Sequence, residues 1–276
     1  MIYLILAFCS SAMVSIVMRF SDGRTSRSYG MLTVNYVVCA VIAAAEAGFG
    51  RILPQVPGIG LTLGLGAVNG LLYLAGFLLF RYNVSRSGVV LSSTFMRLGL
   101  IVTMVISIVF FGEKPGTEQL LGFCLAVLAI VLINDRSGEG SFNPWLLVVM
   151  CSGGLCDGMS KVYEEVGSAS LSGQFLFYTF FVALVLCAVL AWSKKHMPGK
   201  WEWIYGVIIG VPNYYSCKFL LWSLATVPGV IAYPVYSVAG ILLVTLAGVA
   251  VFKERLEKRQ WIALGIILLA LVLLNL

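Results

Sequence analysis

Long apolar stretches alternate with short polar ones along nearly the whole chain. Ten of them approach the roughly 20 residues that an α-helix needs to cross a bilayer. Because they are continuously apolar, they favour helices over the alternating strands of a barrel. The pattern predicts an all-α membrane protein with ten transmembrane helices, over residues 1–19, 28–48, 58–80, 87–111, 117–134, 143–163, 171–192, 202–224, 229–252 and 260–276.

Part of this pattern occurs twice. Residues 229–275 align with residues 88–134 without a gap, and 11 of 47 positions are identical. Glu254 falls on Glu113 and Gln260 on Gln119. The other helices align at nearly the same offset, which predicts two five-helix halves, the second inverted because five is odd. We expect one membrane domain made of residues 1–134 and 143–276, joined by a polar linker at 135–142.

Composition excludes the soluble classes. The chain is 60% hydrophobic and 11% charged, whereas soluble domains are about half apolar and about a quarter charged. The short loops leave no room for an ATPase domain, and no GxxxxGK[ST] motif occurs. The lipid bilayer is therefore the expected surrounding.

The basic residues predict the orientation. Thirteen of the eighteen Lys and Arg residues lie in loops that follow odd-numbered spans, and three lie on the other side. Cytoplasmic loops keep such an excess, so we expect a multi-pass protein of a prokaryotic plasma membrane with both termini extracytoplasmic. Because the charges are scattered over five short loops, nucleic acid is not an expected partner.

Candidate catalytic and metal-binding groups are few. The seven cysteines fall inside spans without CxxC spacing, and the one histidine, His196, lies in a loop. Such cysteines pack as small apolar side chains. We expect no disulfide, no metal site, no cofactor and no catalytic residue, so the chain is not expected to be an enzyme.

Three charged side chains lie deep within spans, namely Arg97, Asp157 and Lys218. A charge at bilayer depth costs roughly 3 kcal/mol or more. No acid lies within one turn of Arg97 or Lys218, so we expect both to line a water-filled cavity and bind substrate. Asp157 has two interpretations: a proton-coupling group, favoured by desolvation, or a structural i,i+4 ion pair with Lys161.

Prolines and polar residues mark the same spans. Pro212 and Pro234 each free a backbone carbonyl, which serves either a packing kink or a ligand. Tyrosine is usually interfacial in membrane proteins, so tyrosines at mid-span indicate an aromatic wall whose hydroxyl groups orient a ligand. Besides Arg97 and Lys218, the expected substrate-binding residues are Ser93, Asn213, Tyr73, Tyr214, Tyr233 and Tyr236.

Other residues are expected to be structural. Small-xxx-small spacing indicates close helix contacts, and it occurs twice in the third span, at Gly60, Gly64, Gly66 and Gly70. Glu113 and Glu254 follow the fourth and ninth spans, and we interpret them as interface residues rather than substrate ligands.

The paired unit carries a family resemblance. Residues 111–122 read FGEKPGTEQLLG and residues 252–265 read FKERLEKRQWIALG, each with Glu six residues before Gln. In this motif and its five-plus-five arrangement, the chain resembles the drug/metabolite transporter superfamily, in particular its ten-helix EamA-like members. The resemblance implies a central cavity lined mainly by helices 1, 3, 4, 6, 8 and 9, with helices 5 and 10 peripheral. Small four-helix relatives carry an acid in helix 1; here Ser15 stands there, and its counterpart in helix 6 is Asp157.

Residues and resemblance together indicate secondary active transport by alternating access, as export or exchange. Two deep cations against one deep acid favour a small polar metabolite with a carboxylate or phosphate, such as an amino-acid-like compound. An organophosphate or nucleotide-sugar antiporter and an accessory subunit of a lipid-intermediate flippase are the alternatives. A homodimer and protons as coupling ions are left open.

Overall fold

The structure, a computed structural model, describes residues 2–48, 52, 56–111, 116–134, 143–224 and 229–274. The regular secondary structure in these residues is helical throughout. One short 3₁₀ turn precedes the seventh helix. The α-helices are α1 (Ile2–Asp22), α2 (Ser28–Ala47), α3 (Ile59–Arg97), α4 (Leu100–Phe111), α5 (Thr117–Asn134), α6 (Trp145–Val166), α7 (Ser172–Ser193), α8 (Lys200–Leu224), α9 (Gly229–Ala250) and α10 (Lys258–Leu274). Within these ranges α1, α2, α3 and α7 are long and apolar enough to cross a membrane.

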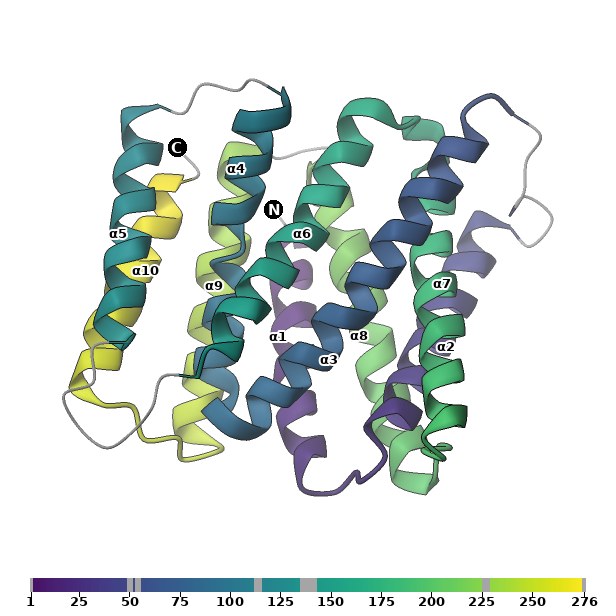
Figure 1. Cartoon of the computed structure of the whole chain (residues 1–276), viewed down its shortest axis with the longest axis horizontal. Helices are drawn as coiled ribbons and strands as arrows, with labels where there is room; N and C mark the ends of the chain where they lie inside the picture. The colour runs from purple at the N-terminus through teal and green to yellow at the C-terminus, as the bar shows by residue number, and fades with distance from the viewer. Residues whose placement is uncertain are drawn as a thin grey trace.

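The third and fourth predicted spans divide differently from the expectation. Hydropathy predicts a loop between residues 80 and 87, but the helix continues to Ser87 and reverses at Gly88, where φ is +81° and ψ is 166°. Only glycine adopts this conformation readily, so the chain turns back without a loop (Figure 1). The polar stretch stays helical because it is anchored: Arg81 is buried and bonds the hydroxyl groups of Ser21 and Thr25.

A second irregularity separates α3 from α4. After Arg97 the helix tightens, because the Gly99 amide bonds the Met96 carbonyl at 3.2 Å and the Ile101 amide bonds the Leu98 carbonyl at 3.0 Å. These i→i−3 bonds are typical of a 3₁₀ turn. A side chain at Gly99 would meet the backbone of Gly154 on α6 at 2.4 Å. The tight turn therefore lies where α6 crosses closely.

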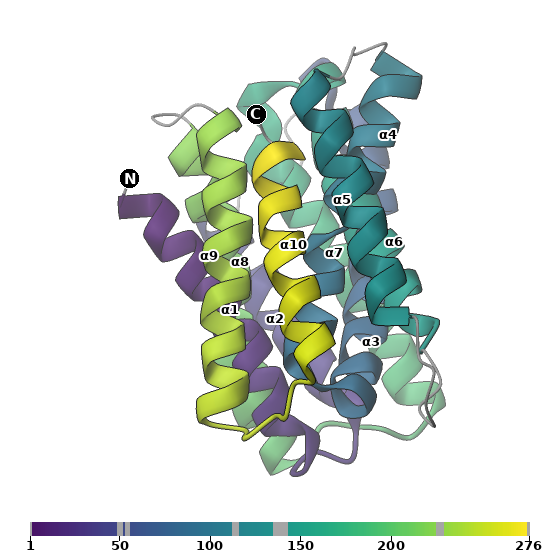
Figure 2. The same cartoon turned by 90° about the vertical axis from the view of Figure 1, so that its left-hand side faces the viewer.

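The helices pack in a recurring arrangement. α3 packs against α6 and α7, and α8 packs against α1 and α2. α5 and α10 lie side by side at one edge, as the resemblance implies, with α9 next to α10 (Figure 2). The core is formed largely by apolar side chains of α2, α3, α7 and α10, with smaller contributions from α1, α8 and α9.

Glycines bring two of these helix pairs together. A Cβ on Gly70 of α3 would meet the Thr179 carbonyl of α7 at 2.4 Å, and one on Gly206 of α8 would meet the Met31 carbonyl of α2 at 2.8 Å. Gly66 and Gly210 make the neighbouring contacts, so the predicted role of Gly66 and Gly70 is confirmed. Gly60 and Gly64 have open space around them instead.

Basic residues gather at one end of the helix bundle. The α1–α2, α7–α8 and α9–α10 connections and the bend within α3 lie at the bottom of Figure 1. The α6–α7 connection lies at the top, and both termini are marked in the upper half. We call the lower end the basic end, because its connections carry Arg24, Arg27, Lys194, Lys195, Lys253 and Arg255.

Candidate substrate site

Arg97 stands at the last position of α3, beside the tight turn, and faces two other helices. Its Nη2 donates a hydrogen bond to Ser11 Oγ of α1 at 2.5 Å. Its guanidinium carbon lies 4.2 Å from the ring centroid of Tyr236 on α9, in cation–π distance. Gly240 lies one turn further along α9. A Cβ at this position would lie only 3.2 Å from Arg97 Nη2, so the glycine provides the space for the guanidinium group. Arg97, Ser11 and Tyr236 are all partly exposed, so this charge is held in place but accessible.

Asp157 of α6 belongs to the same region. Its side chain is exposed, and it lies two residues, or about 200° around the helix, from Leu155, which is also exposed. Gly153, one turn before Asp157, packs against the residue next to Arg97, because a Cβ on Gly153 would lie 2.7 Å from the Met96 carbonyl oxygen. Cys156, the neighbour of Asp157, lies beside the part of α3 that follows Tyr73, because a Cβ on Gly76 would lie 3.9 Å from the Cys156 sulfur. Asp157 is therefore accessible on the side of α6 that faces other helices.

Tyr73 and Cys217 complete this group. The Tyr73 hydroxyl and the Cys217 thiol share a hydrogen bond of 3.1 Å across the space between α3 and α8. The Tyr73 ring also packs edge-on against Phe180 of α7, with ring centroids 5.6 Å apart. We define the Arg97 site as Ser11, Tyr73, Arg97, Asp157, Cys217 and Tyr236, which five helices contribute.

Lys218, which we expected to line a water-filled cavity without a protein partner, has an acidic partner in the structure. No acid lies near it along the chain, but α2 supplies one: Lys218 forms an ion pair with Glu46. Tyr214 donates to the same carboxylate at 2.5 Å, and the Lys218 ammonium lies 4.4 Å from the ring centroid of Trp222. We call these four residues the Lys218 cluster. Its positive charge is neutralised by a partner within the protein.

For the other candidates from the sequence, no contact with Arg97 is seen in the described residues. Asn213 is buried and donates to Asn35 Oδ1 of α2 at 3.3 Å, as a bridge between helices. Ser93 is buried on α3. Pro212 lines an apolar groove between α1 and α8 together with Tyr215 and Met13. The side chains of Tyr233 and Pro234, and that of Lys161, lie outside the described part of the chain.

Sequence reasoning missed Ser11. It is one of several small polar residues in a helix whose middle carries no acid. Its partner Arg97 comes from a helix 86 positions further along the chain. The one available signal was the Ser10–Ser11 pair within an apolar span, and such pairs are common where helices pack.

A comparison with family models settles what kind of protein this is. The model described as the EamA-like transporter family matches residues 1–135 and 144–276. The chain belongs to the EamA-like transporter family. It is therefore a multi-pass membrane protein of a transporter family, as the paired Glu–Gln unit indicated.

Two of the three relatives that follow carry the name of a transporter or of a flippase subunit. An "Uncharacterized protein" of Haemophilus influenzae is 26% identical over 72% of this chain and 69% of its own length. The "Uncharacterized inner membrane transporter YedA" of Escherichia coli K12 is 24% identical over 60% of this chain, and the match spans only 55% of YedA. The "Probable 4-amino-4-deoxy-L-arabinose-phosphoundecaprenol flippase subunit ArnE" of Klebsiella pneumoniae is 38% identical over 22% of this chain and 54% of its own.

One solved structure, described as "Crystal structure of protein", shares the fold. It superposes with a TM-score of 0.59 over 99% of this chain and 94% of its own, at 15% identity. At this identity the likeness shows the fold alone.

Proposed function

We propose that the chain is a secondary active transporter that moves a small polar organic metabolite with a carboxylate or phosphate group by alternating access. The observation that carries the proposal is the state of Arg97. Its partners in the described structure are a hydroxyl group and an aromatic ring, so its charge is not cancelled at contact distance. A guanidinium binds carboxylates and phosphates through two parallel hydrogen bonds.

Asp157 narrows the substrate class. A site with an exposed carboxylate on α6, the helix that packs beside Arg97, suits a compound that carries an ammonium group as well as a carboxylate. An amino-acid-like metabolite has both groups, and export or exchange fits a family of transporters. Tyr73 and Tyr236 would then offer hydroxyl groups and ring faces to the rest of the ligand.

The architecture that we propose for this cycle is ten spans in two inverted halves, residues 1–134 and 143–276, with the linker at 135–142. Packing supports it. In the two halves α1, α2 and α3 correspond to α6, α7 and α8, so the α3–α6 pair corresponds to α8–α1 and the α3–α7 pair to α8–α2. All four pairs are in contact. The two ranges matched by the family model coincide with these halves. Such repeats give two related states that are open to opposite sides.

We further propose that the basic end faces the cytoplasm of a prokaryotic cell, which leaves both termini outside. The concentration of Lys and Arg at that end supports this orientation. Alkaline phosphatase fused to the C-terminus should be active, and a fluorescent protein fused there should stay dark. The reverse result would contradict the orientation.

Asp157 is the residue that we propose for proton coupling. Its accessibility supports proton exchange, whereas an ion pair with Lys161 would make it structural. In proteoliposomes, Asp157→Asn should abolish uptake driven by a pH gradient and spare downhill exchange, because the amide carries no proton to exchange. A variant that keeps gradient-driven uptake but unfolds at lower temperature would instead support the structural ion pair.

The decisive experiment for the function is a thermal-shift screen of the purified protein against amino acids, other carboxylates and organophosphates. A ligand that binds the folded state raises the melting temperature by mass action. We expect a carboxylate-bearing compound to stabilise the protein and Arg97→Gln to remove the shift. A shift that persists in Arg97→Gln would contradict the proposed site.

A second candidate function rests on the similarity to ArnE. A lipid-linked phosphate, or an organophosphate in exchange for another, also presents an anion to Arg97. Short-chain polyprenyl phosphates, added to the same screen, separate the two forms of this alternative. They alone would stabilise a protein that handles a lipid-linked phosphate, whereas the organophosphates would stabilise an exchanger.

A further inference from the structure

Glu254 lies in the connection between α9 and α10, at the basic end, and caps a helical segment of the other half. Its carboxylate accepts hydrogen bonds from the backbone amides of Val89 at 2.8 Å and Val90 at 3.3 Å. These are the first amides after the Gly88 bend, and a negative charge is favourable at such a helix start. A Cβ on Gly88 would lie 2.9 Å from the carboxylate, so the glycine provides the space.

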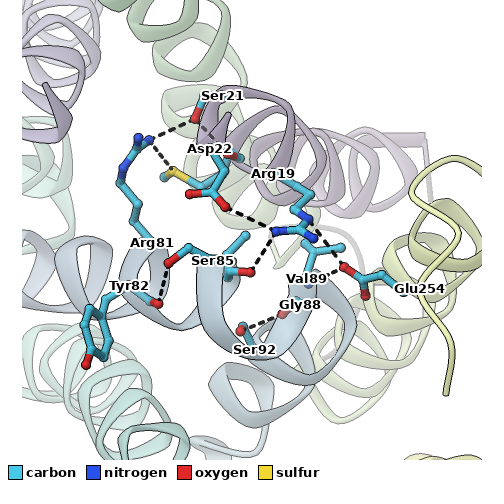
Figure 3. Close-up of polar contacts among 12 residues, drawn as sticks. Arg19, Ser21, Asp22, Arg81, Tyr82, Ser85, Gly88, Val89, Ser92 and Glu254 are labelled. Atoms are coloured by element: carbon cyan, nitrogen blue, oxygen red, sulfur yellow. Dashed lines mark hydrogen bonds and ion pairs between the residues drawn. The ribbon is translucent and has the colours of Figure 1, made fainter. Parts of the chain in front are cut away.

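Arg19 joins α1 to the same carboxylate. Its Nε lies 3.6 Å from Glu254 Oε1, and its Nη1 donates to Asp22 and to the Val84 carbonyl, both at 3.2 Å. Figure 3 shows Arg19 between Asp22 and Glu254, next to the bend at Gly88. Glu254 and Arg19 therefore tie α1, α3 and the α9–α10 connection together at one point. We call this contact the Glu254 clamp.

The clamp is mechanically connected to the candidate substrate site. The segment from Val89 to Arg97 is helical and about 12 Å long at 1.5 Å per residue. At its start it is held by Glu254, and at its end Arg97 contacts Ser11 of α1 and Tyr236 of α9. Both ends of the segment therefore depend on α1 and α9. Its end contacts the two helices directly, and its start contacts Glu254, which follows α9 and pairs with Arg19 of α1.

The sequence contains the elements of this contact twice. The alignment of the repeated stretch pairs Glu254 with Glu113 and Gly88 with Gly229. Glu113 itself lies outside the described residues. Because a glutamate stands at the equivalent position of both repeats, we interpret it as part of the repeated architecture and not as a feature of a single turn.

We propose that Glu254 is a positioning residue of the transport cycle: it holds the basic end closed and transmits the engagement of a ligand at Arg97 to that end. When a ligand anion binds Arg97 and shifts it, the segment from Val89 to Arg97 shifts as one rigid helix, and its capped start shifts with it. Loss of the carboxylate charge would then favour states that are open at the basic end. The link to Arg97 rests on the proposed function, whereas the closure of the basic end does not.

Accessibility of Cys217 from the basic end tests the closure without any ligand. The protein is prepared with Cys217 as its one cysteine, reconstituted in vesicles of uniform orientation, and labelled by a membrane-impermeant maleimide from the side of the basic end. Glu254→Gln should raise the labelling rate about tenfold, which corresponds to about 1.4 kcal/mol. Arg19→Gln should raise it less, because the two amide bonds to Glu254 remain.

Two control variants show whether a higher labelling rate is due to the loss of the Glu254 charge. Glu257→Gln removes the same charge from an exposed position of the same connection and should leave the labelling rate unchanged. Glu254→Asp keeps the charge and should stay near the wild-type rate, which a variant that merely unfolds would not do. If Glu254→Gln labels at the wild-type rate while it remains folded, the closure proposed for Glu254 is wrong.

A second readout separates this inference from the proposed function. With a ligand from the thermal-shift screen, Glu254→Gln should bind with an affinity within about twofold of wild type, less than 0.5 kcal/mol, yet lose counterflow transport. Reduced affinity with unchanged labelling would overturn the inference and assign Glu254 to local stability. If no ligand depends on Arg97, the proposed function fails, and the labelling experiment still decides the closure.

Discussion

Arg97 and Lys218 are two cations in apolar helices with opposite surroundings. Arg97 contacts a serine hydroxyl and a tyrosine ring, whereas Lys218 forms an ion pair with Glu46, to which Tyr214 also donates. Both lie beside an aromatic side chain, so the difference is the carboxylate. In the Lys218 cluster a carboxylate of the protein forms an ion pair with the cation. Within the described residues Arg97 has no such ion pair, although Asp157 belongs to the same region.

This difference separates a structural charge from a candidate binding charge. An ion pair that is mostly shielded from water needs both members, because removal of one leaves the other uncompensated. A cation held by neutral groups is already oriented, and it gains a full ionic partner only when a ligand arrives. The comparison therefore supports our proposal that Arg97 binds substrate, and it favours a role in stability for Lys218.

The largest effect is expected at Arg97. Arg97→Gln removes the cation that binds the ligand anion, and the loss of one member of a shielded charge pair costs about 2–5 kcal/mol of binding free energy. Affinity measured by calorimetry should fall at least about thirtyfold. The melting temperature of the ligand-free protein should change little, because the contacts that Arg97 loses are those to a hydroxyl group and a ring. A large loss of stability with normal affinity would remove the contrast between the two cations.

The second-largest effect is expected for the Lys218–Glu46 pair, as a lower free energy of unfolding when either charge is removed. The two side chains of the pair are 17% and 30% exposed, between the exposed and the buried case, so we expect each of Lys218→Gln and Glu46→Gln to destabilise by about 1–2 kcal/mol. The double variant should lose less than the sum of both. Additive losses of stability would show that the two charges do not interact. A loss of ligand affinity in Lys218→Gln would show that Lys218 takes part in substrate binding after all.

Much of the helical architecture could be predicted from the sequence, because lipid imposes long apolar helices with few alternatives. Most helix bounds differ from the apolar stretches by a few residues. The exception is residues 81–87, which hydropathy alone assigns to a loop. Arg81 is polar along the sequence but buried in space, where Ser21, Thr25 and Ser28 satisfy its donors. One-dimensional hydropathy cannot detect a charge that other helices solvate.

The candidate site was only partly predictable, for the same reason. Depth within a span selected Arg97, Asp157 and Lys218 as unusual residues. It could not distinguish them, because their partners Ser11 and Glu46 lie on other helices, far away along the chain. Glu254 is a similar case: the repeat marked it as structural, but its contact with Val89 depends on how the two halves meet.

The smallest effect is expected at Tyr236, and it tests how Arg97 is held. The ring lies 4.2 Å from the guanidinium carbon, and a cation–π contact of this kind contributes about 0.5–2 kcal/mol. Tyr236→Leu should weaken ligand binding several-fold, because Arg97 is then no longer oriented before the ligand arrives. Tyr236→Phe keeps the ring and should bind within twofold of wild type, less than 0.5 kcal/mol. Equal losses in both variants would instead assign the effect to the hydroxyl group, as a direct ligand contact. If neither variant changes affinity, Ser11 alone suffices to orient Arg97, and the neutral environment of that cation matters more than the ring beside it.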